Sequence, residues 1–214
     1  ESAFDYLPGQ FHFITLHRRR DLPEEEHHFT LSSSPERPGR VASTIKAIGD
    51  FTSTIGETKV GDTATVQGPF GRFSYRLHPA EKDLVFIVGG IGITPLMSML
   101  RSMRDREEDI SVKLLYGNRT EADIVFRTEL DEMQAGSHPN LDVVHILSQA
   151  EEGWEGPEGY IDSHLIEEHV GTDLSGKVFY VCGPEGMRRK VLSDLREMGV
   201  PDRRLRIEIF RLVD

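Results

Sequence analysis

Residues 87–95 read Ile-Val-Gly-Gly-Ile-Gly-Ile-Thr-Pro and join an apolar strand to a helix. The run 84–88 is entirely apolar, which is typical of a strand buried on both faces of a parallel sheet. Gly89, Gly90 and Gly92 permit a tight turn and the close approach of a ligand to the backbone. The free N–H groups at the start of the following helix favour an anionic group. The segment therefore predicts a site for the phosphates of a nucleotide.

Thr94 and Pro95 mark the expected start of this helix, because threonine suits the N-cap and proline suits the first helical position. Apolar residues then follow at helical spacing, at Leu96, Met99, Leu100 and Met103. The glycine spacing differs from Gly-x-Gly-x-x-Gly, so the ordinary dinucleotide fingerprint is absent. A plain structural turn is the alternative interpretation.

A second glycine turn follows the same plan, since the apolar run 178–181 leads into Cys-Gly-Pro-Glu-Gly-Met at 182–187. From residue 81 onward strands and helices alternate. Strands are expected at 84–88, 112–116, 141–147, 178–181 and 205–209, and helices are expected to begin near Pro95, Ala122, Ser163 and Pro184. The alternation predicts an α/β domain with a doubly wound parallel sheet over residues 81–214. In such sheets the ligand lies beyond the carboxyl ends of the strands, where both glycine turns fall.

Residues 1–80 show a different sequence pattern from residues 81–214. Short strands are expected at 11–16, 29–33, 41–48 and 63–67, with proline, glycine and charged clusters between them. This pattern predicts an antiparallel β-barrel domain. The charged run 18–26 is interpreted as a solvated hairpin loop.

The composition is that of an ordinary globular protein with an acidic surface. The 214 residues include 36 acidic and 25 basic side chains, and the net charge is −11. This charge argues against nucleic acid and anionic lipid as partners, and it permits a positively charged redox partner or no special partner. A single cysteine fits a reducing compartment. No apolar run approaches the length of a membrane span and no signal peptide is seen, so we expect a cytoplasmic chain.

Several further motifs stand in a recognisable order along the chain: Pro8-Gly9-Gln10-Phe11, the stretch 27–35, Gly49-Asp50-Phe51-Thr52 and Gly68-Pro69-Phe70-Gly71. Together with the two glycine turns they resemble the ferredoxin–NADP reductase superfamily, and within it most of all the ferric reductases and NADPH oxidases. The resemblance implies an FAD-binding antiparallel barrel followed by an NAD(P)-binding α/β domain. It also implies an N-terminally incomplete barrel and a chain that is a fragment, since the Pro-Gly-Gln element comes early and Glu1 is not methionine.

The family's flavin motif Arg-x-Tyr-Ser is matched by residues 27–30. By resemblance, Phe29 packs against the isoalloxazine ring and the Thr30 hydroxyl lies near the hydride-accepting nitrogen. His27 replaces the arginine, as in ferric reductases, and imidazole is mostly neutral at pH 7. The remaining FAD-binding residues implied are His28, Lys46, Gly49, Phe51 and Thr52, with Lys46 as the replacement positive charge.

The same resemblance places Cys182 beside the reactive carbon of the nicotinamide as a positioning group, and Phe210 over the flavin as a lid. A small buried hydrophobe is the alternative for Cys182, and a core residue for Phe210. The NADP-binding residues implied are Gly89, Gly90, Ile91, Gly92, Thr94, Pro95, Asn118, Arg119, Thr120, Cys182, Gly183, Pro184, Glu185 and Met187.

Nucleotide preference depends on residues 118–123. Arg119 and Thr120 suit a 2′-phosphate, whereas Glu121 and Asp123 suit a free ribose hydroxyl or, alternatively, the first turn of a helix. We expect NADPH, with NADH as the alternative. The nine histidines show no spacing typical of a metal site.

The resemblance implies an oxidoreductase that passes hydride from NADPH to FAD and then single electrons to an acceptor such as the haem of a membrane domain. The chain itself has no span, so it is expected at the cytoplasmic face of such a protein. One alternative is a soluble reductase of ferredoxin or of a fused iron–sulfur domain. Another is a non-catalytic electron-transfer subunit or adaptor.

Overall fold

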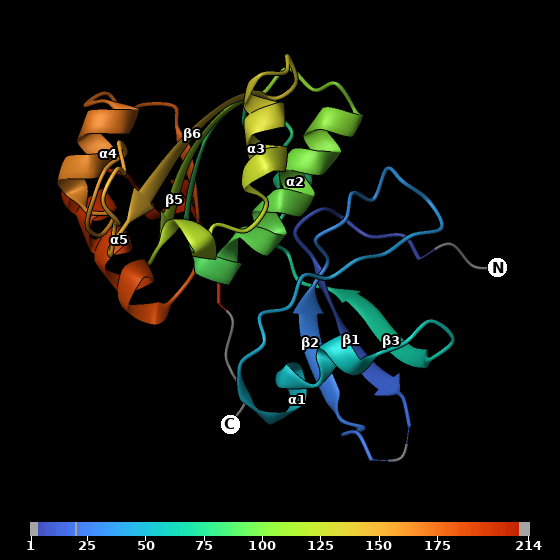
Figure 1. The fold of residues 1–214 in the computed structure, drawn as a ribbon. Coiled ribbons are helices and arrows are strands. Elements are labelled where there is room, and N and C mark those ends of the chain that lie inside the picture. The colour runs from blue at the N-terminus through green and yellow to red at the C-terminus, as the bar shows by residue number, and fades with distance from the viewer. Residues whose placement is uncertain (1–3, 20, 210–214) are drawn as a thin grey trace. The chain divides into compact units, whose positions relative to one another are not determined.

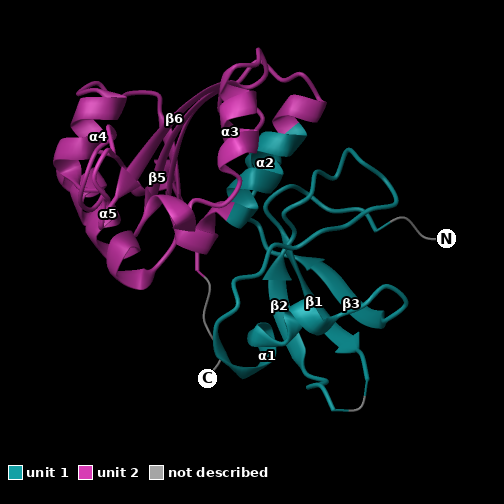
Figure 2. Ribbon diagram, in the orientation of Figure 1, with its two compact units in different colours: residues 1–77, 94–102 teal, residues 78–93, 103–214 magenta. Residues whose placement is uncertain are grey.

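The computed structural model describes residues 4–19 and 21–209, which form two compact units. Unit 1 comprises residues 1–77 and 94–102, and unit 2 comprises residues 78–93 and 103–214 (Figure 2). The division passes through helix α2 (Ile93–Asp105), whose middle belongs to unit 1.

Unit 1 contains an antiparallel sheet in the order β2-β1-β3 (Figure 1). Its strands are β1 (Phe11–His17), β2 (Glu26–Thr30) and β3 (Thr63–Phe70), and its short helices are α1 (Gly49–Ser53), η1 (Ile55–Glu57) and η2 (Tyr75–Leu77). The register places His12 opposite Phe29 and Ile14 opposite His27. Because side chains alternate across a strand, these four lie on one face of the sheet. The antiparallel sheet agrees with the predicted class of this domain.

Residues 41–48 do not form the predicted strand. The Ala42 backbone is bonded to the Ser32–Ser33 turn: the Ser32 N–H donates to the Ala42 carbonyl at 2.8 Å, and the Ala42 N–H donates to Ser33 Oγ at 3.0 Å. Ser43 Oγ lies 3.0 Å from His12 Nε2. Side-chain hydroxyls, Ser33 Oγ and Thr52 Oγ1, therefore accept the Ala42 and Ile48 N–H groups that a strand could use in a ladder.

Unit 2 contains the predicted parallel sheet, in the order β6-β5-β4-β7-β8. Its strands are β4 (Asp83–Gly89), β5 (Ser111–Asn118), β6 (Asn140–Leu147), β7 (Val178–Cys182) and β8 (Leu205–Glu208). Its helices are α3 (Arg127–Gln134), α4 (Ser163–Val170) and α5 (Glu185–Glu197), with the short turns η3 (Gly90–Gly92), η4 (Glu121–Asp123) and η5 (Asp202–Arg204). Helices α4 and α5 cover one face and α3 the other (Figure 1). Burial on both faces explains the continuous apolar runs of the central strands.

Two helices begin elsewhere than predicted. Helix α2 begins at Ile93, so Thr94 and Pro95 lie inside its first turn, because the 3₁₀ turn Gly90–Gly92 runs directly into the helix. The segment near Ala122 forms only the turn η4, which a capping box between Thr120 and Asp123 closes. Phe126, at φ 64°, then separates this turn from helix α3.

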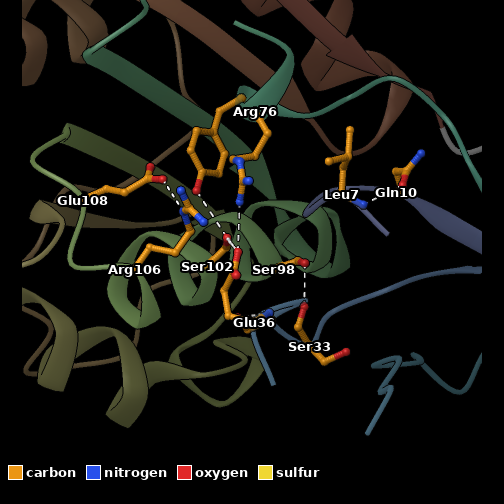
Figure 3. A network of polar contacts seen from close by, with 11 residues as sticks. Leu7, Gln10, Ser33, Glu36, Arg76, Ser98, Ser102, Arg106 and Glu108 are labelled. Carbon is orange, nitrogen blue, oxygen red and sulfur yellow. Dashed lines mark hydrogen bonds and ion pairs between the residues drawn. The ribbon is translucent and has the colours of Figure 1, made fainter. Parts of the chain in front are cut away.

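The middle of α2 is fixed to unit 1 by buried polar groups (Figure 3). Ser98 Oγ donates to the Ser33 carbonyl at 2.6 Å, and Arg101 Nη1 donates to the Ser32 carbonyl at 2.6 Å. Ser102 Oγ donates to Glu36 Oε1 at 3.0 Å. Ser98 and Ser102 are fully buried, and buried hydroxyls require such partners. The turn that follows β2 is therefore held by the helix.

Within the part of the chain that the structure describes, every helix is too short or too polar to span a lipid bilayer.

The close contact between the two glycine turns gives a first prediction. A Cβ at Gly92 would lie 2.8 Å from the Cys182 carbonyl oxygen and 2.9 Å from Gly183 Cα, both of them backbone atoms. We therefore expect Gly92→Ala to lower the free energy of unfolding by about 1–3 kcal/mol.

The matched control is Gly186→Ala, because no atom lies within 4 Å of a Cβ at that helical position. Alanine there should leave stability unchanged or raise it by up to about 1 kcal/mol. Urea unfolding monitored by circular dichroism measures both variants. Equal stability of the two variants would contradict the packing argument.

Candidate functional site

The site in unit 2 is built where the central strands end. Val88 pairs with Cys182 and Gly89 pairs with Gly117, so β4, β5 and β7 finish at the same edge of the sheet. A Cβ at Gly89 would meet Met187 Sδ at 2.7 Å and Pro184 Cδ at 3.0 Å. The two turns thus pack directly on each other, and glycine is required for that contact.

Gly90 differs from its neighbours, because a Cβ there would meet no atom within 4 Å. Its φ is +52°, in the left-handed region that glycine adopts without strain. The Tyr116 hydroxyl donates to the Gly90 carbonyl at 3.2 Å and fixes the turn. Gly90 and Ile91 are half-buried, whereas Thr94 and Pro95 are buried. The open side of this turn, followed by the 13-residue helix α2, suits a phosphate group.

Cys182 and Glu208 are paired at the ends of β7 and β8. Cys182 is fully buried, and burial raises the pKa of its thiol well above the usual range, so it is held as a neutral thiol. Burial also raises the pKa of the Glu208 carboxyl, against the Ile209 N–H and the positive charge of Arg188, which lower it. Arg188 Nη1 donates to the Gly183 carbonyl at 2.7 Å. Arg188 is a neighbour of Cys182 that the sequence motifs did not single out.

Other predicted residues of this site are accounted for by local structure. Asn118 is 7% exposed and ends β5, and Arg119 beyond it is exposed. The Thr120 hydroxyl donates to Asp123 Oδ2 at 2.9 Å. Glu185 begins α5 and is exposed.

In unit 1 the structure brings three of the predicted flavin residues together. The rings of His27 and Phe51 are stacked, with centroids 4.0 Å apart and an interplanar angle of 22°. Phe29 is nearly parallel to both, at centroid distances of 6.2 Å from His27 and 6.5 Å from Phe51. His27 Nε2 also lies 2.9 Å from Glu25 Oε2. Parallel aromatic faces of this kind are suited to a planar ring system.

The other predicted flavin residues are placed differently. His28 and Thr30 alternate with Phe29 and therefore lie on the opposite face of β2, where His28 packs against Phe11 and Phe13. Thr30 is 6% exposed. Thr52 Oγ1 accepts from the Ile48 N–H at 2.8 Å and closes the start of α1. Lys46 and Gly49 are exposed.

Arg18 is the main residue of unit 1 that sequence reasoning missed, because it was assigned to a solvated charge run. The side chain is half-buried and its guanidinium lies 5.4 Å from the centroid of the Phe51 ring. The alternation of side chains along β1 could have identified Arg18 from the sequence, because Arg18 follows Ile14 and Leu16 at a spacing of two. That spacing directs residue 18 to the same face as His27.

Phe210, predicted as a lid, lies outside the described residues. Over residues 4–19 and 21–209, no three His, Cys, Asp or Glu side chains are grouped so that they could hold a metal ion.

The environment of Glu208 gives a prediction about stability. A carboxyl whose pKa is raised by folding binds its proton more tightly in the folded state. Its contribution to stability is therefore greatest below the carboxyl pKa of the unfolded chain and is lost as the pH rises through the folded pKa. Wild-type stability should decline relative to Glu208→Gln over that window. Urea unfolding of both proteins from about pH 4 to about pH 8 measures this decline. A difference in the free energy of unfolding that does not change with pH would contradict the prediction.

Comparisons with known proteins agree with this two-unit organisation. Residues 1–75 match the oxidoreductase FAD-binding domain model, and residues 86–192 match the oxidoreductase NAD-binding domain model. An NADPH nitrate reductase of Emericella nidulans is 36% identical over 163 residues, which cover 71% of this chain and 19% of that protein. NADH-cytochrome b5 reductase 1 of Mortierella alpina is 31% identical over 173 residues, which cover 78% of this chain and 57% of that protein. The chain thus spans less than two thirds of either relative.

Among solved structures, the cytochrome b5 reductase domain of Ulva prolifera nitrate reductase has a TM-score of 0.82 at 25% sequence identity. The match covers 97% of this chain and 87% of that domain. These relatives support the ferredoxin–NADP reductase resemblance, but do not single out the ferric reductases and NADPH oxidases within it. The chain belongs to the flavin-dependent NAD(P)H oxidoreductases of the ferredoxin–NADP reductase superfamily, with an FAD-binding domain followed by an NAD-binding domain.

Proposed function

We propose that this chain is a reductase module that takes hydride from NADPH and delivers electrons singly to a haem-type acceptor. The observation that carries the proposal is the edge where the two glycine turns pack on each other and leave Gly90 open. FAD, when bound, supplies the conversion from a two-electron donor to a one-electron acceptor. The chain's own residues have to bind and orient the two ring systems and keep them in contact.

In unit 2, Gly90 and the start of α2 would receive the pyrophosphate of the nucleotide. Cys182 would lie beside the nicotinamide as a neutral thiol, consistent with its buried position and raised pKa. In unit 1, Phe29 would pack against the isoalloxazine, and the half-buried His27 ring, stacked on the buried Phe51 ring, would offer an aromatic face nearby. No acid–base group is required for hydride transfer itself, so positioning is the main contribution of the protein.

The proposal is tested by the absorbance spectrum of the purified chain after incubation with FAD and gel filtration. Bound flavin should bleach on anaerobic addition of NADPH, and ferricyanide should restore the oxidised spectrum. A chain that retains its fold but binds no FAD would instead support the alternative of a non-catalytic subunit or adaptor.

Thr30 is proposed to donate to the hydride-accepting nitrogen of the flavin. Thr30→Ala should therefore slow flavin reduction by an amount equivalent to about 1–3 kcal/mol while leaving nucleotide affinity unchanged. Stopped-flow reduction with NADPH measures the rate. The control is Thr63→Ala, on the exposed strand β3. Unchanged reduction in the Thr30 variant would remove this residue from the mechanism.

The preference for NADPH over NADH is supported by the way residues 119–127 are paired. Asp123 is engaged by the hydroxyl and N–H of Thr120, and Glu121 forms an ion pair with Arg127. The acidic side chains that would favour a free ribose hydroxyl are thus occupied. Arg119 is exposed, and its contact with Gln149 is long, at 3.5 Å. A guanidinium so placed is suited to a 2′-phosphate.

Arg119→Ala should accordingly raise the KM for NADPH about tenfold or more, with little change in kcat or in the KM for NADH. The reason is that the variant would lose a contact to the 2′-phosphate that contributes equally to the ground state and the transition state. Steady-state ferricyanide reduction with each nucleotide measures this. Arg119→Lys is the control that keeps the charge. An equal effect on both nucleotides would show that Arg119 does not read the 2′-phosphate.

Haem is the proposed acceptor because relatives of this chain are named as reductases of cytochrome b5. The stretch 27–30 also keeps the resemblance to ferric reductases, whose acceptor is a membrane haem, and such a role would place this chain at the cytoplasmic face. Reduction of cytochrome b5, with little ferredoxin-dependent activity, supports the haem assignment. Faster reduction of ferredoxin than of cytochrome b5 would favour the soluble alternative.

A further inference from the structure

Arg18 is a charged residue whose guanidinium lies against the aromatic stack of unit 1, over the Phe51 ring. It follows β1 on the face that carries Ile14, which pairs with His27 of β2. Its side chain is half-buried, whereas the neighbouring Arg19 has a side chain that is 51% exposed and pairs with Asp21 and Glu57. Two adjacent arginines thus have entirely different environments.

The guanidinium of Arg18 forms a fork of hydrogen bonds to the end of the α1 segment. Nη1 donates to the Thr54 carbonyl at 2.8 Å, and Nη2 donates to Thr54 Oγ1 at 3.2 Å and to the Pro23 carbonyl at 3.0 Å. Thr54 is the C-cap of α1, whose last carbonyls carry partial negative charge. The contact therefore joins the β1–β2 connection to the end of a five-residue helix that would be marginal alone.

The same guanidinium also lies over an aromatic ring. It is 5.4 Å from the Phe51 centroid, and the Phe51 ring is stacked on His27 at 4.0 Å. The Phe51 ring therefore contacts both a cation and a second ring. A cation over an aromatic face is favourable, and more so where water is partly excluded.

We propose that Arg18 is a positioning residue for flavin binding, which holds α1 and the Phe51 ring in the arrangement that the flavin requires. The inference rests on the proposed function, because it presumes that this element binds FAD.

The hydrogen bonding of Arg18 explains why it acts through its neighbours. Both terminal nitrogens are engaged by Thr54 and Pro23, and Nε is buried without a hydrogen-bond partner among the described residues. The guanidinium is thus directed into the protein. These contacts depend on the planar geometry of the guanidinium as well as on its charge, and a lysine cannot reproduce the fork of hydrogen bonds.

The test compares FAD affinity in the full chain for wild type, Arg18→Ala, Arg18→Lys and the matched control Arg19→Ala. Quenching of FAD fluorescence gives the Kd, thermal melting of the FAD-free chain gives stability, and calorimetry gives the affinity for NADP⁺. Arg18→Ala should weaken FAD binding by about tenfold or more. Arg18→Lys should recover little of this loss, and Arg19→Ala should bind FAD as wild type does. The affinity for NADP⁺ should be unchanged throughout.

Wild-type affinity for FAD in Arg18→Ala would overturn the inference, and full rescue by lysine would overturn the positioning role. If Arg18→Ala does not fold, Arg18→Lys, which keeps the charge and loses the fork of hydrogen bonds, decides the matter. Weaker FAD binding by Arg18→Lys supports the inference, and wild-type binding overturns it. Failure of the proposed function has a different signature, because wild type itself would then bind no FAD.

Discussion

The nucleotide-binding half of this protein depends on the contact between two backbone turns. A Cβ at Gly92 would come within 2.9 Å of the backbone of residues 182 and 183, and a Cβ at Gly183 would lie 2.9 Å from the nitrogen of Gly89. Such distances leave no room for a side chain at these positions. Because the turns continue β4 and β7, which are neighbours in the sheet, their contact sets where α2 and α5 begin. Within the first turn Gly90 has no atom within 4 Å of a Cβ, whereas Gly89 and Gly92 do, so Gly90 marks where a ligand can approach that turn.

The flavin-binding half depends on a different kind of contact. Its aromatic rings are held in place by polar side chains that bond to the ends of the segments carrying them. Phe51 belongs to a helix of only five residues, too short to be stable by its own hydrogen bonds. Its beginning is closed by Thr52 and its end by Arg18, so side chains replace the missing turns of helix. A ring fixed in this way keeps its stacking partner, His27, in place as well. Preorganisation of this kind reduces the entropy lost when a planar ligand binds.

The sequence predicted the parallel sheet well because burial on both faces leaves an unambiguous apolar run, as in residues 84–88. It predicted poorly where side chains replaced backbone partners. Residues 41–48 alternate like a strand, yet the hydroxyls of Ser33 and Ser43 take part in their bonding. Among candidate site residues, the grouping of Phe29, Phe51 and His27 was anticipated by motif, whereas Arg18 was hidden in a charged run. Composition cannot distinguish a solvated arginine from one that continues the inward face of a strand.

The overall charge is similarly misleading when it is taken for the whole chain. Unit 1 holds ten acidic and ten basic residues and is neutral, whereas unit 2 holds 26 acidic and 15 basic residues, so that the difference of −11 lies entirely in unit 2. An acceptor that takes electrons from a flavin in unit 1 would therefore meet a balanced surface nearby. At physiological salt, charges more than about 8 Å apart are strongly screened. The acidic composition of the chain as a whole therefore gives no reason to require a positively charged acceptor. Shape and the few charges close to the flavin would decide which acceptor is used.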